Sequence, residues 1–334
     1  MKRENLIYLI IISIVCLFFV IGRRIDIHKK RQKETQIKSK KSVSHLSRFT
    51  RCTHPALDEI SGWSQSIRFP SLYWVHNDSF DRARLFVVNQ ECTVLKEFAV
   101  PQALNIDWED LTLDRQGWIY VADSGNNFHW RSDLTLYLIQ EPNLSSLLTS
   151  SSSTLPSSLS LHKKIPFRFP SQTRFPPSEL KKRCFDSEAL FKIKKDLYLL
   201  TKCFYGGQSS IYRLPSPHFH SQSSSPLTLE WIQNIKVGVH LPPFAYRVTG
   251  ADYHEPTQRL IVLTYHNISL FSVHFDLTSA HPTFTHQGSF PLSPALHRQA
   301  EAISWKDAQT ILVANEQRDV FQIKVSDIIQ SPVP

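Results

Sequence analysis

The sequence lacks the short motifs by which many enzymes are recognised. It contains no Gly-x-Ser-x-Gly nucleophile elbow, no His-Glu-x-x-His metal pair, no glycine-rich phosphate loop and no Cys-x-x-Cys pair. These absences remove the common signatures of serine hydrolases, zinc peptidases and nucleotide-binding enzymes. Many of the fifteen histidines fall in predicted loops, where we interpret them as solvated surface: His129, His218, His220, His281 and His286.

The main body of the chain also lacks a large net charge. The whole chain carries a formal net charge of +9, but residues 1–45 hold eleven lysines and arginines against Glu4, Asp26 and Glu34, which gives +8. Residues 46–334 therefore carry only +1. A surface that follows nucleic-acid phosphates needs basic charge on the folded domain, so we expect no nucleic acid as a partner. The basic N-terminal part fits anionic lipid head groups instead.

Residues 5–22 carry no charge and are bracketed by basic residues. Eighteen residues at a helical rise of about 1.5 Å span roughly 27 Å, close to the thickness of a bilayer core. No small-x-small cleavage site follows, and Val15 precedes Cys16 where a lipoprotein signal needs a small residue. We predict a signal anchor over residues 1–24, with a cleaved signal peptide as the alternative. A basic flexible linker over residues 25–46 and a folded domain over residues 47–330 follow.

Convincing helical periodicity is absent after residue 50. Short runs rich in Val, Ile, Leu, Tyr and Trp alternate with turn clusters, so the predicted fold class is all-β. Five segments repeat a small or acidic opening, a turn and an apolar strand, beginning at Glu59, Glu109, Glu188, Gly250 and Glu301. They predict a single β-propeller of about five four-stranded blades, whose last blade takes its missing strand from residues 47–54. A sixth blade, formed by the long insertion before Glu188, is the alternative.

The repeats also predict where polar side chains gather. In four of them the opening residue lies fourteen residues before a position at the end of the second strand, as in Glu109 to Asp123 and Glu188 to Lys202. Antiparallel pairing brings both positions to one mouth of the central channel. The side chains expected there are Glu59, Glu109, Glu188, Glu301, His76, Asn77, Asp78, Asp123, Asn126, Lys202, Tyr265, Asn315 and Glu316, with Asp252 in the fourth repeat.

Several glutamates around one channel repel each other unless a proton, a basic partner or a hard cation neutralises them. Calcium is the natural candidate, because it takes six to eight oxygen ligands from carboxylates, amides and carbonyls. The alternative is that each glutamate only caps backbone amides of the neighbouring blade. If the mouth is catalytic, the candidates are Glu109, Glu188 and Glu301 as general bases near a metal-bound water, with Lys202 as the basic residue clearly placed there.

Four cysteines lie outside the apolar segment, an even number that fits an oxidising compartment. Cys184 and Cys203 sit at the open end of one predicted hairpin, which fits a cross-strand disulfide, and Cys52 and Cys92 are candidates for a second bridge at the closing seam. Four separate buried thiols are the alternative. The basic residues after the apolar segment favour a cytoplasmic domain, whereas the cysteines favour an extracytoplasmic, periplasmic one, which we expect.

The strings DEISGW, LYWVHNDS, NIDWEDLTLD, IYVADSGNN, DSEALF, LYLLTK, RVTGADY and QAEAISW, taken together and in this order, resemble a group of bacterial propellers. These are the exported or membrane-anchored esterase-like phytase-domain proteins and their SdiA-regulated relatives, and the resemblance covers about residues 55–325. It implies a divalent cation at the top rim and, in some relatives, phosphatase-, esterase- or lactonase-like activity. The positions that match the implied metal site are Glu59, Asn77, Asp78, Glu109, Asp123, Asn126, Glu188 and Glu301.

The chain departs from that group at two positions. Asn126 stands where relatives often have a second Asp, and Cys203 stands where a basic residue is common. We expect a membrane-anchored binding or scaffold propeller with a calcium site, whose ligand at the channel mouth is a small molecule or a protein. The alternative function is a calcium-dependent hydrolase acting at the same mouth on a phosphate ester, an ester or a lactone.

Overall fold

A computed structural model describes residues 48–148, 155–179, 183–203, 208–216, 225–237, 247–276, 281–293 and 297–330. The predicted anchor over residues 5–22 and the linker that follows lie outside these ranges. Within them, no helix is both long enough and apolar enough to cross a membrane.

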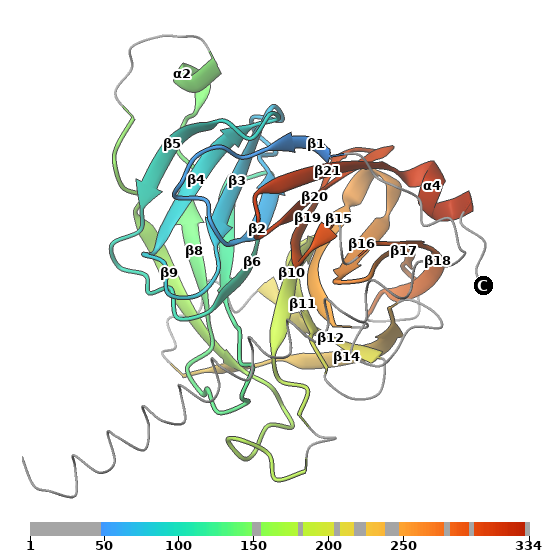
Figure 1. The fold of residues 1–334 in the computed structure, drawn as a ribbon. Helices are drawn as coiled ribbons and strands as arrows, with labels where there is room; N and C mark the ends of the chain where they lie inside the picture. Colours follow the sequence, from blue (N-terminus) through green and yellow to red (C-terminus); the bar gives the residue numbers. More distant parts are fainter. Residues whose placement is uncertain are drawn as a thin grey trace, which may run out of the picture. The chain divides into compact units, whose positions relative to one another are not determined.

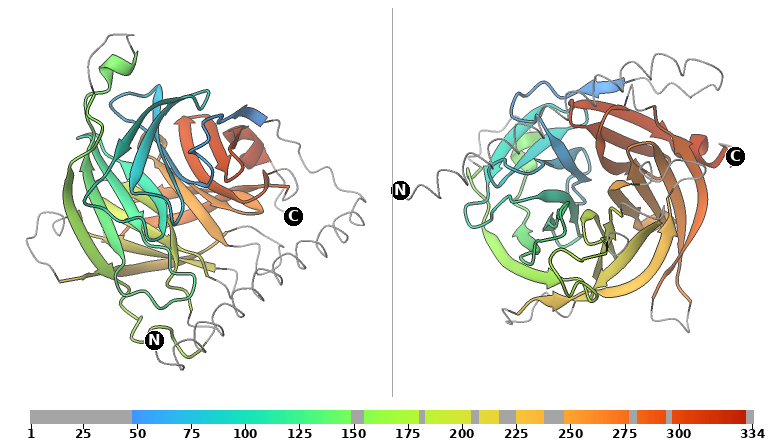
Figure 2. Two further views of the ribbon diagram at one scale, coloured as in Figure 1. Left: turned by 60° about the vertical axis from the view of Figure 1, so that its left-hand side comes forward. Right: turned by 60° about the horizontal axis from the view of Figure 1, so that its bottom comes forward.

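Within the described ranges the strands form five sheets, the blades of a β-propeller arranged around a central channel (Figures 1 and 2). Blade 1 contains β2 (Ile60–Gln65), β3 (Leu72–Asn77), β4 (Arg84–Asn89) and β5 (Val94–Ala99). Blade 2 contains β6 (Trp108–Leu113), β7 (Trp118–Asp123), β8 (Thr135–Gln140) and β9 (Leu161–Arg168), with the short β13 (Leu227–Thr228) parallel to β9. Blade 3 contains β10 (Ser187–Ile193), β11 (Asp196–Thr201), β12 (Gln208–Leu214) and β14 (Glu230–Lys236).

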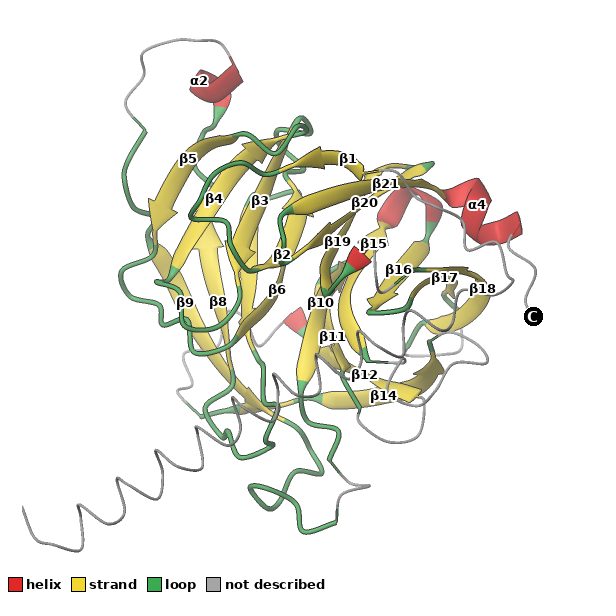
Figure 3. Cartoon of the chain, viewed as in Figure 1, coloured by secondary structure: helices red, strands yellow, loops and turns green. Residues whose placement is uncertain are grey.

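Blade 4 contains β15 (Val248–His254), β16 (Arg259–Thr264), β17 (Asn267–His274) and β18 (Thr283–Pro291). Blade 5 contains β19 (Ala300–Asp307), β20 (Thr310–Asn315) and β21 (Asp319–Lys324), and its outer strand is β1 (Arg48–Arg51). The short helices are α2 (Ser145–Leu148), η4 (Glu255–Thr257) and α4 (Val325–Gln330) (Figure 3). The all-β class and the five blades are confirmed.

The ring is closed by its N-terminal strand. β1 pairs antiparallel with β21, so a strand from the start of the chain completes the last blade, as predicted. A disulfide joins Cys52, next to β1, to Cys92 in the turn between β4 and β5, with their Cα atoms 4.8 Å apart. This bond ties the closing strand to blade 1, so the seam is held covalently as well as by the sheet.

Apolar packing between neighbouring blades supplies the core. The buried residues of the described chain form five clusters, one at each blade–blade interface. The inner strands are buried on both faces, since blades stack on both sides of them: all six residues of β3, β6 and β11 are buried. Every blade interface is therefore filled by side chains, and no blade face is left open.

Each first strand begins with a β-bulge. The strand starts pair as Ile60 with Asn77, Trp108 with Asp123, Ser187 with Thr201, Val248 with Thr264 and Ala300 with Asn315. The register shifts directly after each of these pairs, which leaves one extra residue in every blade. A bulge of this kind bends the strand and redirects a side chain.

This register corrects part of the repeat alignment made from the sequence. The residues equivalent to Glu109 are Ser61 in blade 1 and Thr249 in blade 4, not Glu59 and Gly250. The two residues that pair at the open end of each hairpin are also not a constant number of residues apart, because the turn between the first and second strands differs in length among blades. The predicted rim exists, but its members come from different sequence positions in two blades.

Candidate functional site

The bulge residues divide into two chemical kinds. In blades 1 and 4 they are hydroxyls: Ser61 Oγ donates to the carbonyl oxygen of Glu109 at 2.8 Å, and Thr249 Oγ1 donates to that of Ala300 at 2.7 Å. These two side chains link neighbouring blades. In blades 2, 3 and 5 the same position holds Glu109, Glu188 and Glu301, all buried. The bulges therefore place three carboxylates where the other two blades place short structural links.

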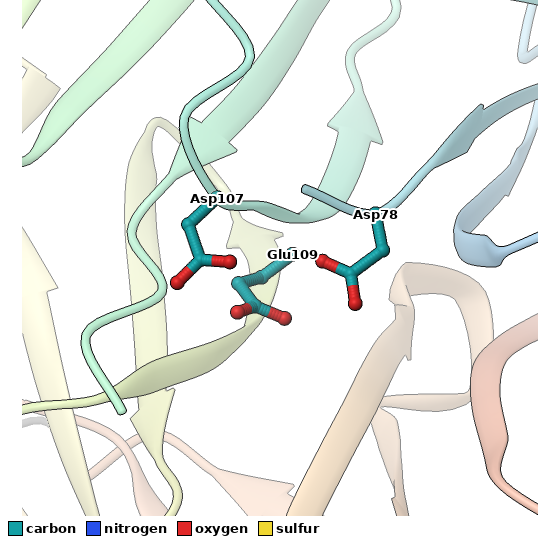
Figure 4. Close-up of side chains that lie close together, drawn as sticks. All are labelled: Asp78, Asp107 and Glu109. Carbon is teal, nitrogen blue, oxygen red and sulfur yellow. The ribbon is translucent and has the colours of Figure 1, made fainter. Parts of the chain in front are cut away.

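Carboxylates from three blades meet at one end of the channel. Asp78, Asp107 and Glu109 can bring one oxygen each to within 4.8 Å of one another, and so can Glu109, Asp186 and Glu188. Figure 4 shows the first trio, with Glu109 between the two aspartates. We call these five residues the acidic cluster. Glu109 belongs to both trios, so it is the centre of the cluster.

Two local features bring these side chains together. Asp107 and Asp186 each stand two residues before a bulge glutamate, directly ahead of β6 and β10. Gly125 lies against the cluster, and its backbone N–H donates to the carbonyl of Asp107 at 3.1 Å. A Cβ added to Gly125 would overlap the Asp107 carboxylate and Oε1 of Glu109. Glycine at this position therefore leaves the space that the carboxylates occupy.

The cluster is unfavourable for negative charge. Burial raises the pKa of Asp78 to about 6 and that of Asp107 to about 7, with neighbouring carboxylates adding to the effect. Burial, followed by the charge of Glu188, raises the pKa of Glu109 and of Asp186 well above the ordinary carboxyl range. Removing these groups from water and crowding them favours their neutral forms, unless a cation is supplied.

Lys202 supplies one positive charge. Its Nζ lies 2.9 Å from Oε1 of Glu188 and 5.5 Å from the ring centroid of Tyr265. Burial alone would lower the pKa of Lys202, but Glu188, Tyr265 and Glu301 raise it well above its ordinary value. Tyr265 in turn donates its hydroxyl to Oε1 of Glu301 at 2.8 Å. Lys202 thus forms its ion pair with Glu188, and its charge also lowers the pKa of Asp78 and of Glu109, against the larger effect of burial.

Three other predicted ligands are held by hydrogen bonds that position loops. Asp123 accepts from the N–H of Asp107 at 3.0 Å and pairs with Arg131 at 3.0 Å. Asn77 donates to the carbonyl of Ala56 at 2.6 Å. Asn126 donates its side-chain amide to the carbonyl of Phe185 at 3.0 Å and its backbone N–H to Asp186 Oδ1. The structure thus places these residues around the acidic cluster as supports.

The other two predicted ligands lie at its edges. Glu59 is exposed, and its carbonyl oxygen accepts from the N–H of Asp78 at 2.8 Å. Glu301 faces Tyr265 in the neighbouring blade. Of the eight positions predicted as metal ligands, the structure brings Asp78, Glu109 and Glu188 into the cluster. The sequence reasoning missed Asp107 and Asp186, although both occur in the string Asp-x-Glu, whose two-residue spacing is repeated in blades 2 and 3.

Backbone amides are capped by other carboxylates. Asp110 accepts from the N–H groups of Leu111 and Leu190, both at 2.8 Å, and Asp252 accepts from the N–H of Trp305 at 2.8 Å. Among the described residues, no backbone N–H donates to the side chain of Glu109. Oδ2 of Asp186, which is fully buried, has no hydrogen-bond partner there either. The capping role considered for the glutamates is thus performed by aspartates: Asp110 and Asp252, and one oxygen each of Asp78 and Asp186. The side chain of Glu109 and Oδ2 of Asp186 keep free oxygen ligands.

These oxygens fit a hard cation. The donors are carboxylates without sulfur or imidazole, a set that suits calcium or magnesium rather than zinc or copper. The unpartnered oxygen of Asp186 lies in the cluster, where a bound ion would satisfy it. Within the described residues each trio can therefore supply three carboxylate ligand atoms to an ion, and Glu109 is common to both trios.

The other end of the channel differs in character. A cavity of about 670 Å³ opens there, lined by residues of the turns between first and second strands. Two ion pairs lie there, Arg115 with Glu255 at 3.0 Å and Lys192 with Asp114 at 3.7 Å, and Lys194 and Lys195 also line the cavity. This mouth therefore presents charges of both signs, whereas the first mouth presents crowded carboxylates.

Comparison with protein-family models and with curated proteins gives no match. Among solved structures, an aldose sugar dehydrogenase from Streptomyces coelicolor, determined in its PQQ-bound form, is similar with a TM-score of 0.48 and 8% identity, over 84% of this chain and 98% of that one. A periplasmic gluconolactonase from Pseudomonas aeruginosa has a TM-score of 0.39 and 12% identity, over 79% and 68%. The Malassezia sympodialis allergen Mala s 1 has a TM-score of 0.41 and 12% identity, over 78% of each chain. Similarity at this level identifies no ligand or reaction for this chain.

Proposed function

We propose that the protein is a membrane-tethered β-propeller that binds calcium in the acidic cluster and presents this mouth to a small-molecule or protein ligand. The observation that carries the proposal is the meeting of five carboxylates from three blades around Glu109. Among the described residues, Lys202 is the one basic side chain that forms an ion pair with a member of the acidic cluster. A divalent cation supplies the charge that this arrangement lacks.

Calcium suits the cluster better than magnesium. Calcium accepts six to eight oxygens in irregular geometry, including carboxylates that bind through one or both oxygens. Magnesium requires near-ideal octahedral geometry and keeps several waters. Five carboxylates delivered by three loops and two bulges provide many oxygens in a crowded, partly buried space. Such a site favours the larger ion.

We also propose that the propeller lies in an oxidising, extracytoplasmic compartment. Disulfides join Cys52 to Cys92 and Cys184 to Cys203, and such bonds persist in oxidising compartments. An anchor at residues 5–22 would hold a propeller of this kind on the extracytoplasmic side of a membrane. The resemblance to SdiA-regulated and phytase-domain propellers noted in the sequence points the same way and stays a prediction.

Thermal unfolding with and without calcium tests the proposal. All strands and all five apolar clusters of the described chain lie within residues 48–330, so a fragment starting at residue 46 contains the whole fold. Calcium should raise its melting temperature after treatment with a chelator. Glu109→Gln should abolish the rise, while Glu255→Gln, which alters an exposed carboxylate at the other mouth, should leave it intact. Equal calcium responses of the two variants would reject the cluster as the site.

Hydrolysis is the second candidate, favoured by the position of Lys202 beside the carboxylates. A metal ion next to a general base would activate water for attack on a phosphate ester, an ester or a lactone. Its weakness is that Lys202 is bound to Glu188, which leaves little positive charge to hold an anionic substrate. Turnover of generic phosphate and carboxyl esters that requires calcium and is lost in Glu109→Gln would establish hydrolysis. Calcium binding without turnover would favour the binding function.

A further inference from the structure

Four loops at the cation-binding mouth carry exposed apolar side chains. They are residues 78–83, 101–107, 124–134 and 169–186, the last described except for residues 180–182, and we call them the apolar strip. Among the described residues, eleven large hydrophobic side chains are exposed, and six of them lie on these loops: Phe80, Leu104, Ile106, Phe128, Trp130 and Phe175. The two longest loops extend beyond the strand ends at the lower side of Figure 1.

Hydrogen bonds join the loops edge to edge. Asn105 Nδ2 donates to the carbonyl of Asp78 at 2.8 Å, linking the first two loops. The N–H of Gly125 donates to the carbonyl of Asp107, linking the second and third. Gln172 Nε2 donates to the carbonyl of His129 at 3.0 Å, linking the third and fourth. The four loops that carry the exposed apolar side chains are therefore joined to one another along one rim.

The exposure of these side chains is large. Phe80 is 97% exposed and has φ of 67°, in the left-handed region that a bulky residue seldom adopts. The rings of Phe128 and Trp130 pack against each other, 4.9 Å between centroids, yet both face solvent. At about 150–250 Å² per aromatic side chain, the four exposed aromatics of the strip present roughly 400–650 Å². This sum over three loops is of the size of the largest contiguous apolar patch on a typical monomer, about 300–600 Å².

We propose that the apolar strip docks on the surface of a lipid bilayer. Arginines stand near two of its aromatic tips: Arg174 precedes Phe175, and Arg82 follows Phe80 after Asp81 and lies 3.9 Å from Glu97. Aromatic rings with neighbouring arginines match the boundary between acyl chains and phosphate head groups. The sequence also supplies proximity, since only 25 residues separate the end of the predicted membrane segment, residue 22, from Arg48. An anchor at residues 5–22 would hold the propeller within reach of a bilayer.

Docking gives the propeller a defined orientation. Asp78 and Asp107 belong to two of the strip's loops, so the cation-binding mouth would face the membrane and its lipid head groups. This inference rests on the membrane tether of the proposed function but not on its cation site, because the apolar side chains point to a bilayer whether or not the cluster binds calcium.

Quenching of tryptophan fluorescence by spin-labelled lipids tests the proposal. The full chain is reconstituted into vesicles of phosphatidylcholine and phosphatidylglycerol. Trp130, 62% exposed, lies in the strip, and Trp231, 54% exposed, lies on the outer strand β14, which makes Trp231 a matched control. Trp130→Phe keeps an apolar ring but removes the reporter. We expect it to lower the quenched fraction by more than half, while Trp231→Phe leaves it unchanged. No quenching, or an equal loss in both variants, would overturn the proposal.

A binding experiment without the anchor gives a second test. The fragment from residue 46 is mixed with the same vesicles, and bound protein is separated by flotation. Removing apolar area from the interface should weaken binding by about tenfold or more in the Phe80→Ser/Trp130→Ser double variant. Trp231→Ser should bind like the unmodified fragment. Failure of the unmodified fragment to float, or equal binding by all three proteins, would reject a bilayer as the partner.

Thermal unfolding of the same proteins separates this proposal from the cation site. The double variant should keep the full calcium-dependent shift in melting temperature, because neither substituted side chain belongs to the acidic cluster. Loss of that shift would show that the substitutions act through the cation site and would contradict an independent docking surface.

Discussion

Glu109→Gln should change the stability of the propeller in opposite directions with and without calcium. Glutamine has nearly the shape of glutamic acid but carries no charge. In a chelator, folding obliges Glu109 either to take up a proton or to carry a charge beside its neighbours, and glutamine avoids both, so the substitution should stabilise the fold. With calcium, it removes a ligand from the residue shared by both trios, so it should destabilise the bound state.

The size of both effects can be estimated. Two unit charges about 5 Å apart repel by about 3 kcal/mol at an effective dielectric constant of about 20. Because some of these carboxylates hold protons, we expect the relief on losing one charge to be about 1–3 kcal/mol at pH 8, or about 2–6 °C in melting temperature. Calcium at a hundred times its Kd stabilises by about 2.7 kcal/mol, or about 5–8 °C, and the variant should lose most of this.

Scanning calorimetry of the fragment from residue 46 measures both effects, in chelator and in calcium at pH 8. The expected pattern is a crossing: the variant melts above the unmodified fragment in chelator and below it in calcium. Glu255→Gln, at the other mouth, should change neither melting temperature by more than about 1 °C. A Glu109→Gln variant that melts lower in chelator yet keeps the whole calcium shift would refute the reasoning.

Three further predictions follow from the same contacts. In chelator, the free energy of unfolding should fall as pH rises from about 4 to about 7. Burial raises the pKa of Asp107 from 3.8 to about 7, so in this range the folded state keeps a proton that the unfolded state has lost. This one group lowers the free energy of unfolding by up to about 4 kcal/mol. Calcium should flatten that profile in urea titrations at each pH, and a profile that rises with pH in chelator would contradict it. Gly125→Ala should weaken calcium binding at least tenfold by calorimetric titration, since its methyl group would occupy space held by Glu109 and Asp107; unchanged affinity would show that this contact relaxes without cost. Cys52→Ser/Cys92→Ser should destabilise the fragment by about 3–4 kcal/mol in urea unfolding, because the bond closes a 40-residue span; an unchanged midpoint would mean that the closing strand is held by the sheet alone.

Much of the fold is visible in the sequence because each blade repeats the same pattern. An inner pair of strands buried on both faces must be nearly continuous in apolar residues, and strings such as LYWV and LYLL show this directly. The closing strand was predictable for a related reason. The last repeat ends after three strands, and a propeller with an unpaired outer position exposes a sheet edge.

The acidic cluster was predictable only in part. Glu109 and Glu188 stand out because their positions repeat, but a bulge has no distinct sequence signal, so Glu59 was aligned where Ser61 belongs. Asp107 and Asp186 lie just before their strands, and an aspartate occurs at this position in blades 2 and 3 only. A comparison that looks for positions shared by all five repeats therefore does not find them.

The roles of the asparagines were not visible in the sequence at all. The Nδ2 groups of Asn77 and Asn126 donate to the carbonyl oxygens of Ala56 and Phe185. The atom that would bind calcium is Oδ1, which accepts from the N–H of Arg131 in Asn126 and has no hydrogen-bond partner among the described residues in Asn77. Such contacts join residues far apart in the chain, and they depend on how each loop folds over the rim.

The central claim is that carboxylates from three blades hold one calcium ion around Glu109. Calorimetric titration of the chelator-treated fragment with calcium at pH 6.5, in two buffers of different ionisation enthalpy, tests it most directly. The account predicts one ion per chain, release of protons from carboxyl groups such as Asp107 as the ion binds, and loss of binding in Glu109→Gln. Absence of binding, or binding of equal affinity without proton release in both proteins, would contradict it.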